Sequence, residues 1–488
     1  MFHRDARHHR LVMSCAMLSL LTACTVGPDY VRPSATPVMP AAYKETNGWK
    51  PAQPRDEAIR GTWWARYNDP VLNALEERVA VSNQNVIAAE AQFRQARALL
   101  QAARAGYFPT ASLGASVTNS RSSATLSDSQ FIANNSTTDY RLPVDLSWEI
   151  DIWGRIRRTV ESGRAGAQAS AADLAALRLS AQASLAQAYF QLRALDSQQH
   201  LLDSTADAYQ KTLDLTRNRY ASGVAARADV LQAETQLKST QAQAIDLGVQ
   251  RAQLEHAIAL LVGEPASSFS LAAATLTAAP PPVPIGVPSQ LLERRPDIAA
   301  AERRMAAANA QIGVAEAAWY PSLSLSASGG LESTSLAKWL TWPSRFWAVG
   351  PSISETLFDG GLRAAQSEQA RAAYDAQVAA YRQTVLTGFQ EVEDNLATLR
   401  ILEREARVQD ETVAAARQSL AITGNQYRAG VASFLNVLVA QTAELSSELT
   451  AIGIQGRRMV ASVLLIKALG GGWDAAALPS GEEMEKGK

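Results

Sequence analysis

Cysteine and histidine are scarce in this chain of 488 residues, which holds two of the first and five of the second. Both cysteines, Cys15 and Cys24, lie near the N-terminus, so the rest of the chain can form neither a disulfide nor a cysteine-based metal site. Beyond the first ten residues only His200 and His256 remain, each in an expected helix as an ordinary surface residue. Acid–base and metal chemistry need convergent titratable groups. We therefore expect no enzyme, no catalytic residue, no metal site and no cofactor.

The chain also lacks an excess of either charge. Lys and Arg together number 46, and Asp and Glu number 47, which gives a net charge of −1. A phosphate-binding surface usually shows as a basic excess. The balance therefore gives no reason to expect nucleic acid as a partner.

A basic start and a short apolar run mark the N-terminus. Arginines at positions 4, 7 and 10 precede an apolar run over residues 11–21, and Thr22, Ala23 and Cys24 follow it. This is the order of a secretory signal, and the run is too short to span a bilayer as a helix. Leu-Thr-Ala-Cys is similar to the bacterial lipobox, in which the cysteine is acylated and becomes the new N-terminus; the alternative is a plain signal peptide with a chance cysteine. Thr25 stands where many lipoproteins of the inner membrane have aspartate, which favours the outer membrane.

Most of the mature chain repeats itself at a spacing of about 210 residues. AGYFPTASLGASVTNS corresponds to AAWYPSLSLSASGGLE, LSWEIDIWGRIR to SISETLFDGGLR, and YASGVAARADVL to YRAGVASFLNVL. Three matches in the same order indicate two copies of one unit.

This repetition divides the chain into six parts. Residues 1–23 form the signal peptide, and residues 24–67 form an acylated leader whose many prolines leave little room for helix. The first repeat covers 68–277, a Pro-rich linker and equatorial segment covers 278–296, the second repeat covers 297–470, and a C-terminal tail covers 471–488.

Each unit contains a pair of segments in which apolar and polar residues alternate. Pro109 and Pro321 each end a helical stretch, and the alternation begins directly after them. It is clearest over residues 142–151, where Leu, Val, Leu, Trp and Ile interleave with polar residues. Period two predicts strands with one apolar and one polar face, and a length of about 10 residues suits a membrane barrel.

Aromatic residues flank these segments at both ends. One group lies toward the helices and the other toward loops expected over residues 119–140 and 332–346: Tyr107, Phe108, Trp153, Trp319, Tyr320 and Phe358 in the first, and Tyr140, Trp342, Phe346 and Trp347 in the second. Two aromatic girdles are typical of membrane barrels, so the loops are expected to be extracellular. The alternative is a pair of soluble hairpins packed on the helices.

A very long helical pattern follows each strand pair, over residues 155–218 and 362–426. Each would measure on the order of 100 Å. Shorter helices are expected over residues 85–105, 226–262, 297–316 and 433–468. The two short helices of one copy sum to nearly one long helix and, stacked end to end, would run antiparallel beside it. A cytosolic coiled coil, the alternative, explains neither the strands nor the signal.

Several motifs together resemble the outer-membrane factor (TolC-like) family, and specifically the NodT-type lipoproteins of drug and metal efflux. They are LTACTVGPDYVRP, LLERRPDI, KALGGGW and the paired Tyr-x-x-Gly-Val turns at Tyr220 and Tyr427. The resemblance covers essentially the whole chain. It implies a mostly α-helical fold with a small β part, in which three copies each give four strands to a 12-stranded transmembrane β-barrel continued by a long periplasmic α-helical barrel.

The residues themselves leave the number of copies open. Four strands have exposed edges, which hydrocarbon does not tolerate, and the smallest membrane barrels have about eight strands. One chain therefore cannot close a barrel, whereas two, three or four copies could. The trimer comes from the resemblance.

By the same resemblance, the protein is the outer-membrane channel of a tripartite efflux pump. It passively conducts drugs or other small toxic compounds received from an inner-membrane RND-type transporter through a periplasmic adaptor. Its expected partners are two further copies, the adaptor, the transporter and outer-membrane lipid. The alternative within transport is the exit duct of a type I protein secretion system, and the alternative from another class is a periplasmic enzyme with a helical scaffold.

Two glycines, Gly223 and Gly430, interrupt the long helical patterns and predict helix reversals. Glycine there supplies the left-handed backbone that a helix C-terminus commonly needs. The resemblance implies that these turns are periplasmic tips that contact the adaptor, through Tyr220, Gly223 and Val224 in one copy and Tyr427, Gly430 and Val431 in the other. A plain reversal without contact is the alternative.

The expected aperture departs from the family pattern. In TolC-like channels, aspartates after the second-copy tip surround the closed opening. The matching positions here are Asn436 and Val439, and the corresponding first-copy position is Asp229. Three crowded carboxylates repel one another and favour cations, whereas three amides do neither strongly. We therefore expect an aperture less sensitive to divalent cations, unless Asp229 faces a neighbouring helix instead.

Overall fold

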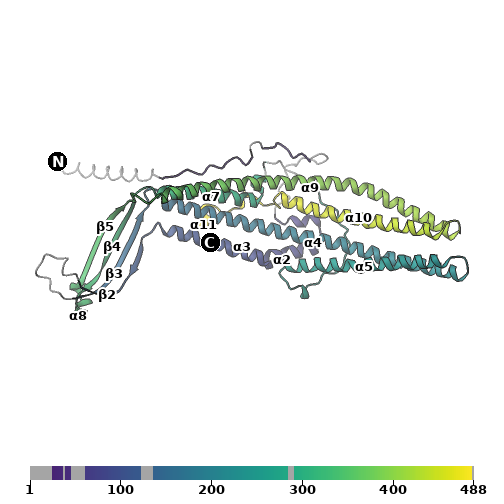
Figure 1. Ribbon diagram of the computed structural model, residues 1–488, viewed down its shortest axis with the longest axis horizontal. Coiled ribbons are helices and arrows are strands. Elements are labelled where there is room, and N and C mark those ends of the chain that lie inside the picture. The colour runs from purple at the N-terminus through teal and green to yellow at the C-terminus, as the bar shows by residue number, and fades with distance from the viewer. Residues whose placement is uncertain are drawn as a thin grey trace.

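The computed structural model describes residues 25–36, 39–45, 61–121, 136–283, 289 and 291–485. The expected signal peptide and Cys24 lie outside these residues. The molecule is elongated, with its strands at one end and its long helices extending away from them toward two helical turns at the other end (Figure 1).

Five strands form one antiparallel sheet: β1 (Thr110–Leu113), β2 (Ser116–Ser120), β3 (Thr137–Ile150), β4 (Ser322–Ser333) and β5 (Arg345–Ser354). Their order is β1-β3-β4-β5, and β2 continues the line of β1 beside β3. The pairing of β3 with β4 joins the two repeats, with Leu146 opposite Ala327. The strand pairs of both copies therefore lie in one continuous sheet.

The strands extend further into the expected loops than the apolar alternation indicated. The loop placed over residues 119–140 is shorter, because β2 reaches Ser120 and β3 begins at Thr137. Polar residues continue the pairing there, and the Asn119 side chain donates to Thr138 Oγ1 at 2.8 Å. The second expected loop, 332–346, is a compact turn that contains α8 (Leu336–Trp339) and the 3₁₀ turn η5 (Trp342–Ser344).

Two helices of 67 residues, α4 (Arg155–Ala221) and α9 (Leu362–Arg428), run the length of the helical part. At 1.5 Å per residue each is about 100 Å long. The helices α3 (Gln84–Ala105) and α5 (Arg227–Leu261) pack against α4, and α7 (Pro296–Ala317) and α10 (Phe434–Ala468) pack against α9 (Figure 1). These lengths and pairings confirm the arrangement expected from the helical patterns.

The helix ends follow from local sequence. Asp69 caps α2 (Pro70–Ser82) by accepting hydrogen bonds from the Val71 and Leu72 amides. Pro296 begins α7, with Asp297 in its first turn, as expected. Among the described helices, α10 is long and apolar enough to cross a membrane by length and composition, and 44% of that apolar stretch is buried inside the protein.

The main apolar core lies halfway along the helices. There η2 (Trp63–Tyr67) and α2 pack against α4, where the Tyr67 and Phe190 rings are 4.8 Å apart. A second core, which includes Leu213, Leu237 and Phe434, lies near the helical turns. Two separate cores hold the α4–α5 and α9–α10 pairs together along their length.

Short elements complete the fold: η3 (Ala266–Ser268), α6 (Leu291–Arg294), η6 (Ala475–Ala477) and α11 (Gly481–Glu485). The last of these lies in the C-terminal tail and packs back onto the first repeat. Met484 is buried there with Leu100 and Ile156.

Candidate functional site

The register of the sheet separates an apolar face from a polar face. Residues directly opposite one another share a face, and the apolar face collects Leu, Val, Trp and Ile from all the longer strands. These side chains are exposed: Val144 is 46%, Val349 62% and Ile353 73% accessible. The polar face collects serine, threonine, glycine and acidic residues. A sheet with one bare apolar face is suited to a lipid environment.

The two edges of the sheet have no partner within the described chain. β1 and β2 form one edge and β5 the other, and each is paired on one side only. Unpaired backbone groups are not tolerated in hydrocarbon. In a membrane, this sheet requires further strands on both sides.

Aromatic residues lie at both ends of the apolar face, as the sequence predicts. At the helix end, the rings of Trp153 and Tyr320 stack 4.8 Å apart, and Phe358 is 87% exposed. At the loop end, the ring centroids of Tyr140 and Trp339 are 5.8 Å apart, and Trp339 belongs to α8. Phe346 corrects the expectation, because it pairs with Gly330 and so belongs to the polar face, not to a lipid-facing girdle.

An aspartate and an arginine fix each junction between strand and long helix. Asp151 accepts hydrogen bonds from the Ile156 and Arg157 amides, and the Arg157 side chain returns to Asp151. In the second repeat, Asp359 accepts from the Gly361 and Arg363 amides, and Arg363 Nε contacts it at 2.6 Å. These bonds lower the pKa of the Asp359 carboxyl, the Arg363 side chain contributing most. The repeated motif was visible in the sequence, but its role as a junction clamp was not.

The leader lies along the outside of the helices without helix of its own in residues 25–36 and 39–45 (Figure 1). It starts at the strand–helix junction, where the Val26 amide donates to Trp153 O. Further along, Tyr30 donates to Glu302 at 2.7 Å, and the guanidinium of Arg32 donates to Tyr381 at 3.1 Å. Thr25, the residue after Cys24, therefore lies beside the end of the strands.

A close backbone approach holds the start of the leader. Gly27 has a φ of +96°, and a Cβ there would overlap the Cα of Gly313 in α7. Burial and the neighbouring Glu302 raise the pKa of the Tyr30 hydroxyl, so it stays a hydrogen-bond donor. The sequence indicated an extended leader but gave no sign of its long-range partners.

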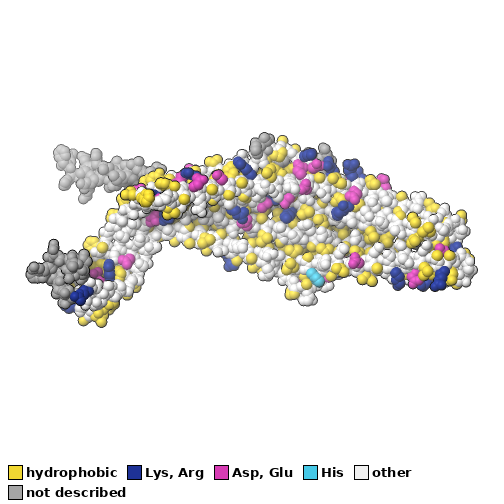
Figure 2. Space-filling model, viewed as in Figure 1, with side chains coloured by type: hydrophobic (Ala, Val, Ile, Leu, Met, Phe, Trp, Pro, Cys, Tyr) yellow, Lys and Arg dark blue, Asp and Glu magenta, His cyan; other side chains and the backbone are white. Residues whose placement is uncertain are grey.

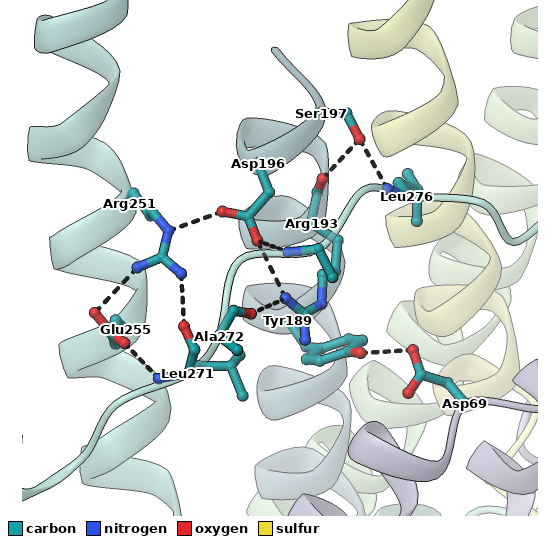
Figure 3. Close-up of polar contacts among 11 residues, drawn as sticks. Asp69, Tyr189, Arg193, Asp196, Ser197, Arg251, Glu255, Leu271, Ala272 and Leu276 are labelled. Carbon is teal, nitrogen blue, oxygen red and sulfur yellow. Dashed lines mark hydrogen bonds and ion pairs between the residues drawn. The ribbon is translucent and has the colours of Figure 1, made fainter. Parts of the chain in front are cut away.

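A buried charge network ties the end of the first repeat to its helices (Figure 3). Asp196 accepts from Arg193 at 3.1 Å, from Arg251 at 2.8 Å and from the Ala274 amide at 3.0 Å. Arg251 also donates to Leu271 O at 2.7 Å. The segment that leaves α5 is thereby fixed across α4 and α5.

The two expected tips lie side by side at the end of the molecule opposite the strands (Figure 1). Gly223 and Gly430 have φ values of +76° and +78°, which confirms the left-handed backbone predicted for both. Val224 and Val431 are 65% and 80% exposed. Charged side chains gather along the same end of the surface (Figure 2).

The two tip tyrosines differ. Tyr220 is 47% exposed, whereas Tyr427 is 7% exposed and packs 5.5 Å from Phe434. Arg219 of the first tip covers the Tyr427 ring at 4.7 Å and donates to its carbonyl. Tyr427 therefore joins the two tips from inside, and its side chain is not on the surface of this chain.

The three aperture candidates follow these tips. Asn436 and Val439 are exposed on α10. Asp229 is half-buried in the first turn of α5, and its carboxylate accepts from the Ala226 amide at 3.3 Å. Asp229 thus has a capping contact within its own helix.

His200 and His256 are exposed, as expected.

Together these features define a membrane-channel protein: a sheet for the outer membrane, continued by a helical extension about 100 Å long. The chain belongs to the outer membrane efflux protein family, which it matches over residues 75–264 and 287–471. It is the outer-membrane component of an efflux system, with a periplasmic helical extension.

Relatives and solved structures agree with this assignment. The chain is 31% identical over 461 residues to the probable efflux pump outer membrane protein TtgC of Pseudomonas putida, covering 93% of this chain and 94% of that protein. It is 30% identical to nodulation protein T of Rhizobium leguminosarum, covering 94% and 96% of the two chains. The solved outer-membrane channel OprN superimposes with a TM-score of 0.85 at 32% identity, covering 92% of this chain and all of the other.

Proposed function

We propose that three copies of this chain form the exit duct of a tripartite efflux pump. The observation that carries the proposal is the sheet, which has one apolar face and two unpaired edges and continues directly into the α4 and α9 helices. Three such sheets would close a barrel of 12 strands, counting β1 and β2 as one, and their helices would continue it into the periplasm. The duct itself is passive and carries out no chemistry.

The partners proposed for the duct are a periplasmic adaptor and an inner-membrane RND-type transporter. The tips would contact the adaptor, and the exposed side chains there are Tyr220, Val224 and Val431. Tyr427 and the two glycines would act by shaping the tips. Asn436, Val439 and Asp229 would lie near the aperture, with Asp229 also capping its helix.

Acylated Cys24 would anchor each copy to outer-membrane lipid. What supports this is the position of Thr25, which contacts Gly154 at the start of α4. A lipid on the preceding residue would then lie near the helix end of the strands, at the level of the inner leaflet.

The cargo class that fits these relatives is small molecules. Relatives carry names such as toluene efflux and pyoverdine export outer membrane proteins. We infer that this chain likewise conducts small toxic compounds, whereas a polypeptide cargo would make it a type I secretion duct.

A deletion strain complemented with the chain tests this function. We expect deletion to increase susceptibility to drugs, metals or solvents, and the chain to purify as a trimer that conducts ions in bilayers. Loss of a secreted polypeptide with unchanged susceptibility would instead support type I secretion. A chain that purifies as a monomer without conductance would overturn the duct.

A further inference from the structure

The polar face of the sheet changes character along its length. From the helix end toward the loops, β4 presents Ser322, Ser324, Ser326 and Ser328, and β5 presents Ser354, Ser352, Gly350 and Ala348. All of these side chains are small. On β3 the same face carries Ser147 and the acidic residues Asp145 and Glu149. On the surface seen in Figure 2, Lys, Arg, Asp and Glu gather at the loop end of the strand region.

At the loop end, three large side chains come together on this face. The Arg141 guanidinium lies over the Phe346 ring, 4.7 Å from its centroid. Its Nε lies 3.8 Å from a carboxylate oxygen of Glu332, the residue opposite it on β4. Arg141 therefore holds the ring on one side and the carboxylate on the other.

The register leaves room for the aromatic ring. Phe346 lies opposite Gly330, which has no side chain that could occupy the space of the ring. A larger residue does not fit at position 330, because a Cβ there would overlap the backbone of β3. Among the strand residues described, Phe346 is the one aromatic residue on the polar face. It is half-buried, whereas the next residue, Trp347, is on the opposite face and is 79% exposed.

The diameter of a barrel backbone is set by the number of strands and their stagger, so the free bore at each height depends on the side chains that point inward. On β5 the polar-face side chains change from serine, glycine and alanine to Phe346 toward the loops, and this change narrows the bore. We propose that Phe346, positioned by Arg141 and Glu332, forms a ring near the outer mouth of the duct that limits the size of the molecules that pass. This inference rests on the proposed function, because the ring requires three copies around one lumen.

Thiol labelling from outside the cell tests the ring. With Cys24 acylated, Ser326→Cys places an unmodified thiol on the polar face, on the helix side of Phe346. Cells carrying this variant are treated with a small maleimide and with maleimides on polyethylene glycol of increasing mass. The same measurement is made after adding Phe346→Ala, Phe346→Trp or, as the matched control, Trp347→Ala.

We expect Phe346→Ala to increase the labelling rate for large reagents and Phe346→Trp to decrease it, while the small reagent labels all variants equally. Trp347→Ala should match the parent, because that side chain is on the apolar face. Equal rates for large reagents in the parent and in both Phe346 variants would overturn the ring while leaving the duct intact. If the small reagent fails to label Ser326→Cys, the polar face is not a water-filled lumen, and both the ring and the proposed duct are wrong.

Discussion

At the scale of single residues, Glu76 is the most unusual side chain in the helical part. It is fully buried in α2, and its carboxylate oxygens have no hydrogen-bond partner among the described residues. Burial raises the pKa of the Glu76 carboxyl to about 9. At neutral pH the group is therefore protonated in the folded chain.

The position of Glu76 predicts a pH-dependent stability. Its folded pKa of about 9 exceeds the ordinary value of 4.5, so the folded chain binds one more proton between these values. The contribution of Glu76 to the free energy of unfolding is fully present below pH 4.5. It decreases by about 1.4 kcal/mol per pH unit as the pH rises from there toward 9. Between pH 5 and 9 the free energy of unfolding of wild type should therefore fall by about 1.4 kcal/mol per pH unit relative to that of Glu76→Gln, and thermal unfolding should show this as a lower midpoint temperature. Exposed Glu77 provides the control, since Glu77→Gln should retain the wild-type pH profile; identical profiles for Glu76→Gln and wild type would contradict the prediction.

The aperture candidates give a second prediction at this scale. Asn436→Asp would set three carboxylates near the axis of a trimer, and crowded carboxylates bind cations. Single-channel recording with added divalent or trivalent cations should show more block in Asn436→Asp than in wild type. Asp229→Asn should reduce any block that wild type shows, as long as the first turn of α5 stays helical. If block is the same in all three proteins, these positions do not line the aperture.

At the scale of elements, the helical tips depend on two glycines in the left-handed region. A side chain there costs about 1–2 kcal/mol of local strain. Gly223→Val combined with Gly430→Val should distort both tips and abolish efflux, measured as drug susceptibility, while trimers still form. The control is Gly248→Val, since Gly248 is exposed inside α5 with an ordinary φ and open space around it. Normal efflux in the double variant would exclude a role of tip shape in adaptor contact.

The elements themselves were predictable, and most of their tertiary contacts were not. Helices α4 and α9 end within three residues of the expected positions, because the glycines that flank them and a helical period are local signals. The strand alternation also gave the faces of β3 and β4. By contrast, the face on which Phe346 lies is set by its pairing with Gly330 on another strand. Asp196 binds Arg251, which lies 55 residues further along the chain. Such contacts leave no periodic trace in a single sequence.

At the scale of the whole molecule, the anchor is the feature to test. We expect the intact mass of the purified protein to begin at Cys24 and to include acyl chains, because several chains together anchor stably. Cys24→Ala should lose that mass yet still reach trimers, since the barrel itself holds the membrane. A mature chain that begins elsewhere and carries no lipid would exclude the lipoprotein.

The course of the leader also has a consequence for the order of events during biogenesis. Its described partners in the helices α7 and α9 include Glu302, Tyr381 and Arg400, which follow their leader residues in the chain by 272, 349 and 355 residues. The N-terminus is exported first, so its docking surface does not yet exist when the leader reaches the periplasm. The leader can reach its final position only after most of α9 has been translocated and has folded against α7. Its docking is therefore a late step, and an exposed leader would mark chains whose second half is not yet in place.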